Sequence, residues 1–415
     1  MFATIKQIFN PKNRDLLKRI LFTLAALFVF KIGTAIIVPG VKVNAAGMDF
    51  LAVLDAMSGG AFANASIFAL GVSPYITASI VIQLLSADIV PYLSELKNQG
   101  GVGRKKLDQI TRIVGIGLAF LQGYLYSYAY IGNGNAMDYM LYSLILTAGT
   151  ALVMWIADQI TAKGIGNGMS LIIMAGNISV LPNMFKNLWV ELFDKGFLGI
   201  AIFVAFVLVF VGIIVGVIYV ESAERRIPIQ YANKSTSTLG KQSYIPFKLN
   251  SSGVMPVIFA SVIFTIPSFI AGLLDSENAF AVFVTKYVNY TTPVGFAAYM
   301  LIIILFCFFY TFLQINPEEL SKNLNKSGGY IPGVRPGKET KQYISTVIGR
   351  ITLIGALFIA VVAGLPIVFS SFINTGLPSS VSLGGTSILI VIGIALETYN
   401  KLESSLLNRN YKGGK

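Results

Sequence analysis

The chain has 415 residues, of which 55% are hydrophobic and only 12% are charged, and its mean hydropathy is +0.72. Soluble proteins carry about a quarter charged residues, so this composition excludes an ordinary soluble protein and predicts a polytopic membrane protein. The formal net charge of +12 is compatible with nucleic acid, a membrane surface or an acidic partner, and its distribution along the chain has to decide among them.

Reactive side chains are scarce. There is no histidine, which removes the commonest general base and the commonest metal ligand. The single cysteine, Cys307, lies inside an apolar run, so no disulfide and no cysteine metal site can form within one chain. The sequence therefore predicts no enzyme activity, no metal and no cofactor.

Apolar windows of about 20 residues, the length needed to cross a bilayer, predict ten spans. They lie near 20–38, 73–90, 113–131, 140–160, 168–185, 197–220, 251–273, 296–315, 346–367 and 383–400. The stretch 48–70 is too short and too mixed to cross alone, and we expect it to be a re-entrant or half-inserted segment.

Lysine and arginine indicate the orientation of these spans. Most of the 31 basic residues fall in the two terminal segments and the even-numbered connections, whereas the opposite side holds only Lys42, Lys186, Lys195 and Lys286. Because cytoplasmic loops are enriched in Lys and Arg, both termini are predicted to be cytoplasmic. Lys31 lies within the first span, where its side chain is expected to reach an interface or a neighbouring helix.

Two cytoplasmic connections, 221–250 and 316–350, are far longer than a link between two helices requires. Loops of this length are usually functional or disordered, and the second one carries Gly and Pro turn signals on both sides of Arg335. The charge could simply fix orientation. The length favours a docking surface, either for an acidic protein or for structured RNA.

Ten spans divide into five and five, and a repeat with an odd number of spans must be inverted relative to its twin. Inverted repeats place the functional site at their interface near the midplane. We assign 1–220 to an N-terminal half, 221–250 to a cytoplasmic loop and 251–415 to a C-terminal half, with the pseudo-repeat itself covering about 1–185. This division follows from counting spans, since no residue-level repeat is visible.

The stretch 58–85, SGGAFANASIFALGVSPYITASIVIQLL, contains a break at Gly71-Val72-Ser73-Pro74. Pro74 has no backbone N–H and disfavours the α conformation at Ser73, so we expect a short half-helix, a break and a longer helix. A break at membrane depth has to be surrounded by protein or a water-filled cavity, which makes it a candidate pore element. A Pro-kinked helix packed through small residues is the alternative.

Three further segments, 164–178, 250–264 and 383–397, also begin with small or polar residues and continue with an aliphatic stripe. Small residues let helices approach closely, so ordinary tight packing accounts for the pattern. A narrow apolar gate, formed where aliphatic side chains of several helices meet, accounts for it equally well.

Six stretches closely resemble the SecY family, the channel subunit of the general protein translocase, and they occur in the family's order across nearly the whole chain. They are 58–85, 159–178, 246–263, 306–320, 327–340 (SGGYIPGVRPGKET) and 384–393. The resemblance implies an all-α membrane protein with two inverted five-helix halves, a re-entrant plug and an hourglass pore. Such a protein conducts unfolded secretory polypeptides and releases signal sequences and membrane helices laterally into lipid.

The resemblance also implies residue roles. The pore ring would consist of Val72, Ile76, Met169, Ile173, Ile258, Val262 and Ile390, where the family favours Ile, so that Val72 and Met169 depart mildly. The plug would be 48–64, including Met57, Ser58, Gly59 and Gly60, although the loop before it is short. Spans two and three would face spans seven and eight across a lateral gate, with Gln83 and Asn250 as a polar pair. Arg335, Lys241 and Lys248 would contact the motor or the ribosome.

The partners implied are the small membrane subunits SecE and SecG, the SecA motor ATPase, a translating ribosome, signal peptides, nascent polypeptides and membrane lipids, in a bacterial plasma membrane. An ion-coupled secondary transporter with inverted repeats would share the broken helices. It needs an intramembrane ion site, and the near absence of charge in the spans argues against it. An intramembrane enzyme is opposed by the missing histidine.

Overall fold

The structure is a computed structural model that describes residues 14–39, 58, 60–62, 64–87, 89–131, 135–193, 196–231, 243–273, 278–288, 292–372 and 384–412. Met57, Gly59 and Lys241 lie outside these residues, as does most of the predicted plug.

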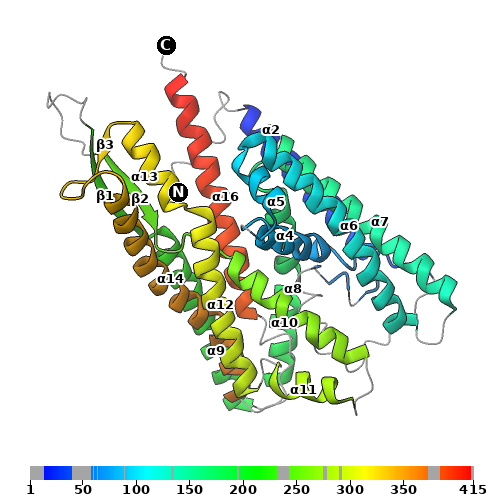
Figure 1. Cartoon of the computed structure of the whole chain (residues 1–415). Helices are drawn as coiled ribbons and strands as arrows, with labels where there is room; N and C mark the ends of the chain where they lie inside the picture. Colours follow the sequence, from blue (N-terminus) through cyan, green and yellow to red (C-terminus); the bar gives the residue numbers. More distant parts are fainter. Residues whose placement is uncertain are drawn as a thin grey trace.

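The described chain is mainly helical, as expected for an all-α membrane protein (Figure 1). Its longer helices are α2 (Arg14–Ala35), α4 (Ser73–Leu85), α6 (Gly101–Ile131), α7 (Ala136–Lys163), α8 (Gly168–Phe193), α9 (Gly196–Ser222), α10 (Met255–Leu273), α12 (Pro293–Gln314), α14 (Lys338–Phe372) and α16 (Gly384–Lys412). Each of the ten predicted spans overlaps one of them. The short helices α5 (Pro91–Asn98), α11 (Ala279–Tyr287) and α13 (Pro317–Lys326) lie in connections.

Within the described residues, five helices are long and apolar enough to cross a membrane by length and composition, namely α7, α8, α9, α12 and α14. Helix α4 is apolar but has only 13 residues, about 20 Å at a helical rise of 1.5 Å per residue. It is therefore shorter than the hydrocarbon core of about 30 Å. The chain is a multi-pass membrane protein, and α4 by itself is too short to cross the hydrocarbon core.

Local sequence explains where helix α4 begins. Gly71 has φ +53, which favours glycine, and Pro74 occupies the first turn, where its missing N–H costs no hydrogen bond. The predicted break is therefore present; Ser58 is helical, and most of the described residues between it and Ser73 lie in turns. At the other end the helix stops at Leu85 rather than at residue 90; Val90 is extended, as expected before a proline, and Pro91 begins α5.

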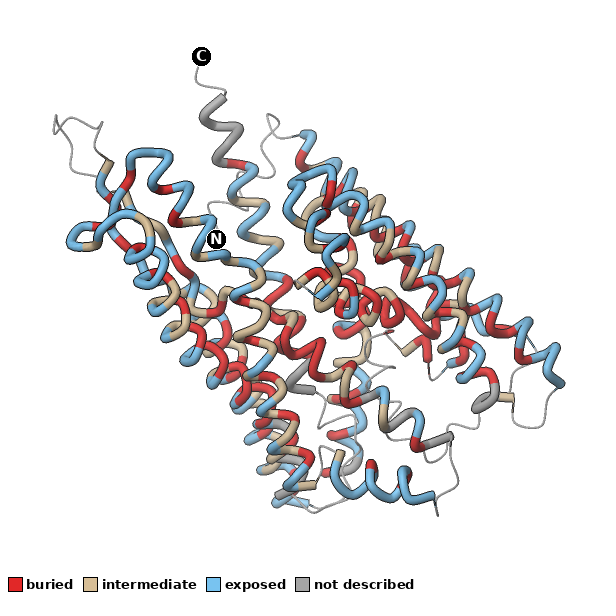
Figure 2. The backbone as a smooth tube through the Cα atoms, in the orientation of Figure 1, coloured by how far each residue is buried: buried red, intermediate tan, exposed pale blue. Residues whose placement is uncertain are grey.

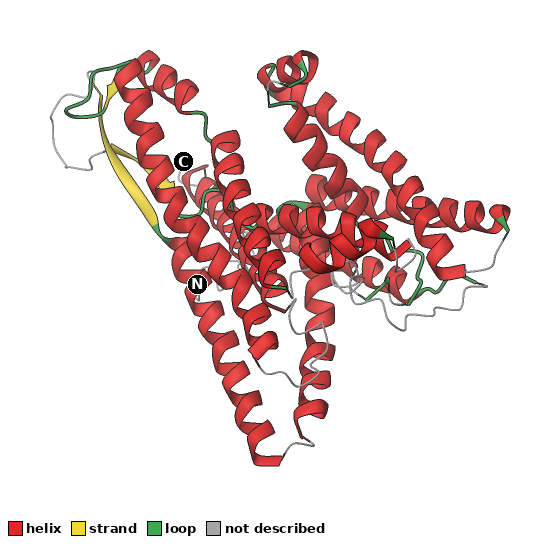
Figure 3. Cartoon of the chain, turned by 60° about the horizontal axis from the view of Figure 1, so that its bottom comes forward, coloured by secondary structure: helices red, strands yellow, loops and turns green. Residues whose placement is uncertain are grey.

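The helices gather into two groups that lean apart like a V (Figure 3). Helices α6 and α7 pack together on one side, and α12 and α14 pack together on the other (Figure 1). Between them, α4 contacts α10, and α8 packs against α16. Helix α9, which the predicted boundary at residue 220 places in the first half, packs against both α8 and α16.

Buried residues concentrate where these central helices meet, and exposed residues follow the outer faces (Figure 2). The outer faces are themselves apolar: Phe197 and Leu208 on α9 are largely exposed, and so is Ile354 on α14. A soluble monomer rarely exposes apolar surface so continuously, so these faces are suited to lipid.

The two long connections fold together into one compact unit, called here the loop unit. Strands β1 (Glu224–Tyr231) and β2 (Ser243–Lys248) form an antiparallel hairpin, and β3 (Gly329–Tyr330) from the second connection adds to β1, giving the order β2-β1-β3. Beneath the sheet, α13 and the start of α14 complete a small core. Its buried residues are Ile227, Ile229, Phe247, Leu324, Ile331, Ile344 and Ile348.

Candidate functional site: an apolar waist

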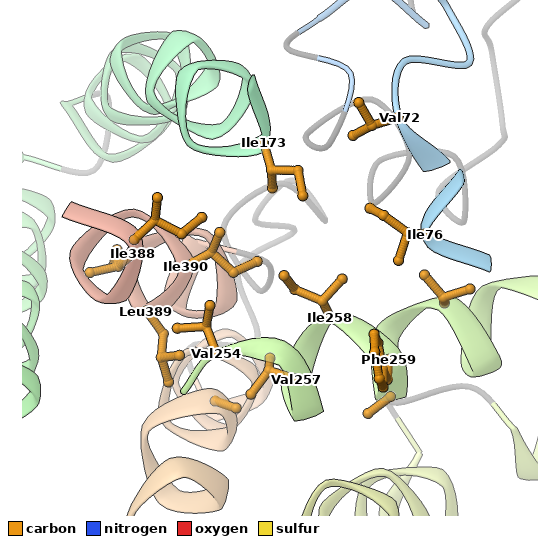
Figure 4. Close-up of a cluster of buried hydrophobic side chains, with 14 of the residues drawn as sticks. Val72, Ile76, Ile173, Val254, Val257, Ile258, Phe259, Ile388, Leu389 and Ile390 are labelled. Carbon is orange, nitrogen blue, oxygen red and sulfur yellow. The ribbon is translucent and has the colours of Figure 1, made fainter. Parts of the chain in front are cut away.

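Aliphatic side chains from four parts of the chain meet at the centre of the molecule. Figure 4 shows Val72 and Ile76, Ile173 of α8, Ile258 of α10 and Ile390 of α16 directed toward one another. Of the seven residues expected to form the pore ring, six are buried members of a single cluster, and Met169 is partly buried and packs against it. We call these seven residues the waist.

Local sequence places these side chains on matching helix faces. Val72 and Ile76 are four residues apart, as are Met169 and Ile173, and Ile258 and Val262. Residues separated by four lie above one another on the same side of a helix. The first three elements therefore each contribute a pair of side chains on one face, and α16 contributes Ile390 alone.

Glycines let the surrounding backbones come close enough to hold the waist together. A Cβ on Gly393 of α16 would lie 2.3 Å from Cγ1 of Val254, which belongs to the same buried cluster. A Cβ on Gly168, at the start of α8, would lie 1.8 Å from the carbonyl oxygen of Ala157 on α7. A side chain at Gly393 would push α16 away from Val254, which directly precedes α10. A side chain at Gly168 would push α8 away from α7.

The side chains of the waist can exclude water, but they carry no group suited to catalysis. Its six aliphatic side chains neither donate nor accept hydrogen bonds, the Met169 sulfur accepts only weakly, and none of the seven is titratable, so they bind no passing side chain strongly. A narrow apolar constriction excludes water when closed.

The segment that leads into the waist is fixed to its neighbours. Ser58 is buried, its Oγ accepts a hydrogen bond from the Phe62 N–H at 3.1 Å, and the Gly60 carbonyl accepts one from Asn64 Nδ2 at 2.9 Å. Phe62 packs edge-on against Tyr126 of α6, with 5.0 Å between ring centroids. Ser58 and Gly60, two of the residues predicted for the plug, thus belong to a packed region beside α6.

The two polar residues expected at the lateral gate are not bonded to each other in this structure. Gln83 Nε2 donates to Ser79 Oγ at 2.8 Å within α4, and Gln83 Oε1 is buried with no hydrogen-bond partner among the described residues. Asn250 is buried and bonds to Glu221, at the end of α9, and to Ser252. The helices that would form the two sides of the gate, α4 and α10, are nevertheless in contact.

The loop unit presents basic side chains. Lys248 is exposed at the end of β2, and the Arg335 side chain is 88% exposed, with its nearest charge, Glu339, 4.0 Å away. The hydrogen bond from Arg226 to Glu224 raises the pKa of Arg226 above its already high ordinary value. The unit thus combines a fixed core with a positively charged surface.

Sequence reasoning missed an ion pair that joins two of the predicted spans. Arg112 at the start of the third predicted span bonds to Asp158 near the end of the fourth, at 2.9 Å, and joins α6 to α7. The sequence did offer a signal for this pair, since Arg112 and Asp158 place opposite charges at the ends of two consecutive predicted spans. Glu221 was also missed, because it falls at the border between a span and a loop.

The fold is that of the SecY and Sec61 channels. A solved structure of the SecY protein, described as having a plug domain that stabilises the closed state of the translocation channel, matches with a TM-score of 0.66 at 18% identity, covering 93% of this chain and 91% of that one. Sec61 in the canine ribosome–channel complex from the endoplasmic reticulum matches with a TM-score of 0.63 at 17% identity, with the same coverage.

The chain belongs to the SecY family. The family's sequence model matches residues 66–399. The protein translocase subunit SecY of Halalkalibacterium halodurans is 45% identical over 433 residues, which cover 100% of this chain and 99% of the relative. The secondary-transporter alternative finds no support in these matches.

Proposed function

We propose that this chain is a protein-conducting channel that passes unfolded secretory polypeptides through the waist and releases signal sequences and membrane helices sideways into lipid. The observation that carries the proposal is the convergence of six aliphatic side chains from separate elements in one buried cluster, with Met169 packed against it. Figure 4 shows five of the six. Membership of the SecY family supports it.

An aliphatic waist suits a substrate of arbitrary sequence. It closes around a passing chain through side-chain contacts that have no directional requirement, and it contains no polar group that would hold one residue type. When no chain is present, the ring closes on itself and blocks ions. The residues 48–64 would add a plug on the external side.

Lateral release requires the seam between α4 and α10 to part. A signal sequence contains about 7–15 apolar residues. Moving this segment from water into lipid stabilises it by roughly 25 cal/mol per Å² of apolar surface. Contact between α4 and α10 supports the placement of the seam.

The driving force would come from partners. The exposed Arg335 and Lys248, together with Lys241, form the proposed contact for the SecA motor or a translating ribosome, and the ribosome-bound Sec61 neighbour supports the second. SecE and SecG are proposed as small membrane subunits, and lipids would border the seam.

The proposed location is a bacterial plasma membrane with both termini cytoplasmic. A bacterial relative covering the whole chain supports the first point. The cytoplasmic placement of both termini is supported by the basic loops. The start of α2 and the end of α16 also lie toward the same end of the molecule as the sheet (Figure 1).

A crosslink tests the lateral gate. Gln83→Cys and Asn250→Cys are introduced with Cys307→Ser, so that a single cysteine pair remains. Because a signal peptide would insert between α4 and α10, the disulfide yield should fall when the peptide is added. A yield insensitive to the peptide would remove the lateral-gate role.

A further inference from the structure

Arg335 lies between β3 and α14, and both polar groups of its backbone are hydrogen-bonded. The Arg335 N–H donates to Glu339 Oε2 at 3.4 Å, and the Arg335 carbonyl accepts from Thr340 Oγ1 at 2.8 Å. The Arg335 side chain, in contrast, is 88% exposed. The backbone of this residue is therefore fixed, while its guanidinium lies in solvent.

Both ends of the turn 331–337, which carries Arg335, are attached to the loop unit. At its start, Ile331 is buried in the core of that unit. At its end, the Gly337 carbonyl accepts from Oγ of the buried Ser321 on α13 at 2.9 Å, and Gly337 has φ +102, which favours glycine. Arg335 lies between these two anchors, so its position depends on the bonds made to its own backbone.

Of the two bonds to the Arg335 backbone, the one from Thr340 has the better geometry. A distance of 2.8 Å is usual for a hydroxyl donor, whereas the 3.4 Å bond to Glu339 is long. Thr340 is buried, so water competes little for its hydroxyl, while the Glu339 side chain is 58% exposed. Thr340 is therefore the main support of the Arg335 backbone.

We propose that Thr340 is a positioning residue for ribosome docking, which fixes the backbone of Arg335 so that its guanidinium extends from the loop unit toward the ribosome. This inference rests on the proposed function, in which Arg335 contacts the partner, and the ribosome-bound Sec61 of the same fold favours the ribosome. A guanidinium binds phosphate through two parallel N–H groups, so the contact requires a set direction. A residue with an ordered backbone also loses less conformational freedom on binding.

Electron paramagnetic resonance of a nitroxide attached to Arg335→Cys tests the positioning itself. The full channel complex is used, with Cys307→Ser so that this chain holds a single cysteine. Thr340→Val keeps the shape of the side chain and removes the hydroxyl, so the nitroxide should become more mobile and its spectrum narrower. Thr340→Ser keeps the hydroxyl and should retain the broad spectrum. The matched control is Thr346→Val, because the Thr346 hydroxyl donates to the Gln342 carbonyl within α14.

Ribosome binding to the complex, with Arg335 in place, shows whether this position matters for docking. Thr340→Val should weaken binding roughly threefold, the effect of losing one hydrogen bond, while Thr340→Ser and Thr346→Val should bind like the unaltered chain. Arg335→Ala should weaken binding more. Adding Thr340→Val to Arg335→Ala should cause no further loss, because Thr340 acts through the arginine. If Thr340→Val does not accumulate in the membrane, Ser321→Ala takes its place and should have the same two effects.

The inference is overturned if Thr340→Val leaves the spectrum or the ribosome binding unchanged, or if its loss of binding persists in the Arg335→Ala background. A loss seen with the SecA motor and not with ribosomes would overturn the choice of partner. Failure of the proposed docking contact looks different, because Arg335→Ala would then bind ribosomes as tightly as the unaltered chain, which removes the docking role of both residues.

Discussion

At Gly149 on α7 there is no room for a side chain, since a Cβ would lie 2.0 Å from the carbonyl oxygen of Ile67. Ile67 belongs to the segment that leads into the waist, and its N–H donates to the Ile36 carbonyl at 3.0 Å. One missing side chain therefore lets α7 support the backbone immediately before α4.

Gly149→Ala should therefore destabilise the protein by about 1–3 kcal/mol, the usual cost of overpacking a tight site. The matched control is Gly212→Ala on α9, where nothing lies within 4 Å of the added Cβ. Thermal unfolding of the purified complex in detergent measures both. Equal unfolding midpoints for the two variants would show that α7 and Ile67 are not in tight contact.

At the scale of elements, hydropathy located the membrane helices but not their ends. Helix α6 begins at Gly101, twelve positions before the predicted span at 113, because its first turns are charged and an apolar window does not register them. Helix α4 ends at Leu85, before its apolar run does, and a new helix starts at Pro91. Length and apolarity predict where a helix lies, while its ends depend on caps and prolines.

The sheet could not be predicted from the two connections. Pro228 and Pro246 lie within β1 and β2, and a proline within a run argues against a strand because it cannot donate to the ladder. The pairing of Gln230 with Tyr330 also joins residues from different connections. Only the tertiary fold brings them together.

The loop unit should behave as a small folded body with its own core. Ile344 is fully buried in that core, so Ile344→Ala should cost about 2–5 kcal/mol. Hydrogen exchange in 224–231 and 243–248 should quicken. Tyr343→Ala at the neighbouring exposed position is the control, and equal exchange in the two variants would argue against a shared core.

Arg335 should act through its exposed charge rather than through the fold. Arg335→Glu should weaken binding of the motor ATPase or the ribosome by about tenfold or more, because a favourable charge becomes a repulsive one. Hydrogen exchange of the loop unit should stay unchanged. Lys326→Glu, an exposed charge reversal on α13, serves as the comparison. If both substitutions weaken binding equally, Arg335 has no special role.

At the scale of the whole molecule, the composition of the four small-residue segments left tight packing and an apolar gate equally open. The resemblance to SecY selected seven residues, and the structure gathers them on one buried cluster. The bonding at the seam was beyond sequence reasoning, because Glu221 and Asn250 are 29 positions apart and meet only in the folded chain. A pattern identifies the kind of side chain, whereas its partner depends on the tertiary arrangement.

The central claim is that apolar side chains from separate helices close the membrane at the waist, and resting ion conductance in planar bilayers tests it most directly. Ile76→Asn and Ile390→Asn each place a polar group in the seal and let water in, whereas Ile354→Asn changes a largely exposed position on the outer face of α14. We expect each of the first two to raise the leak about tenfold, equivalent to weakening the closed state by about 1.4 kcal/mol, and the third to leave it unchanged. An unaltered leak in both Ile76→Asn and Ile390→Asn would contradict the account.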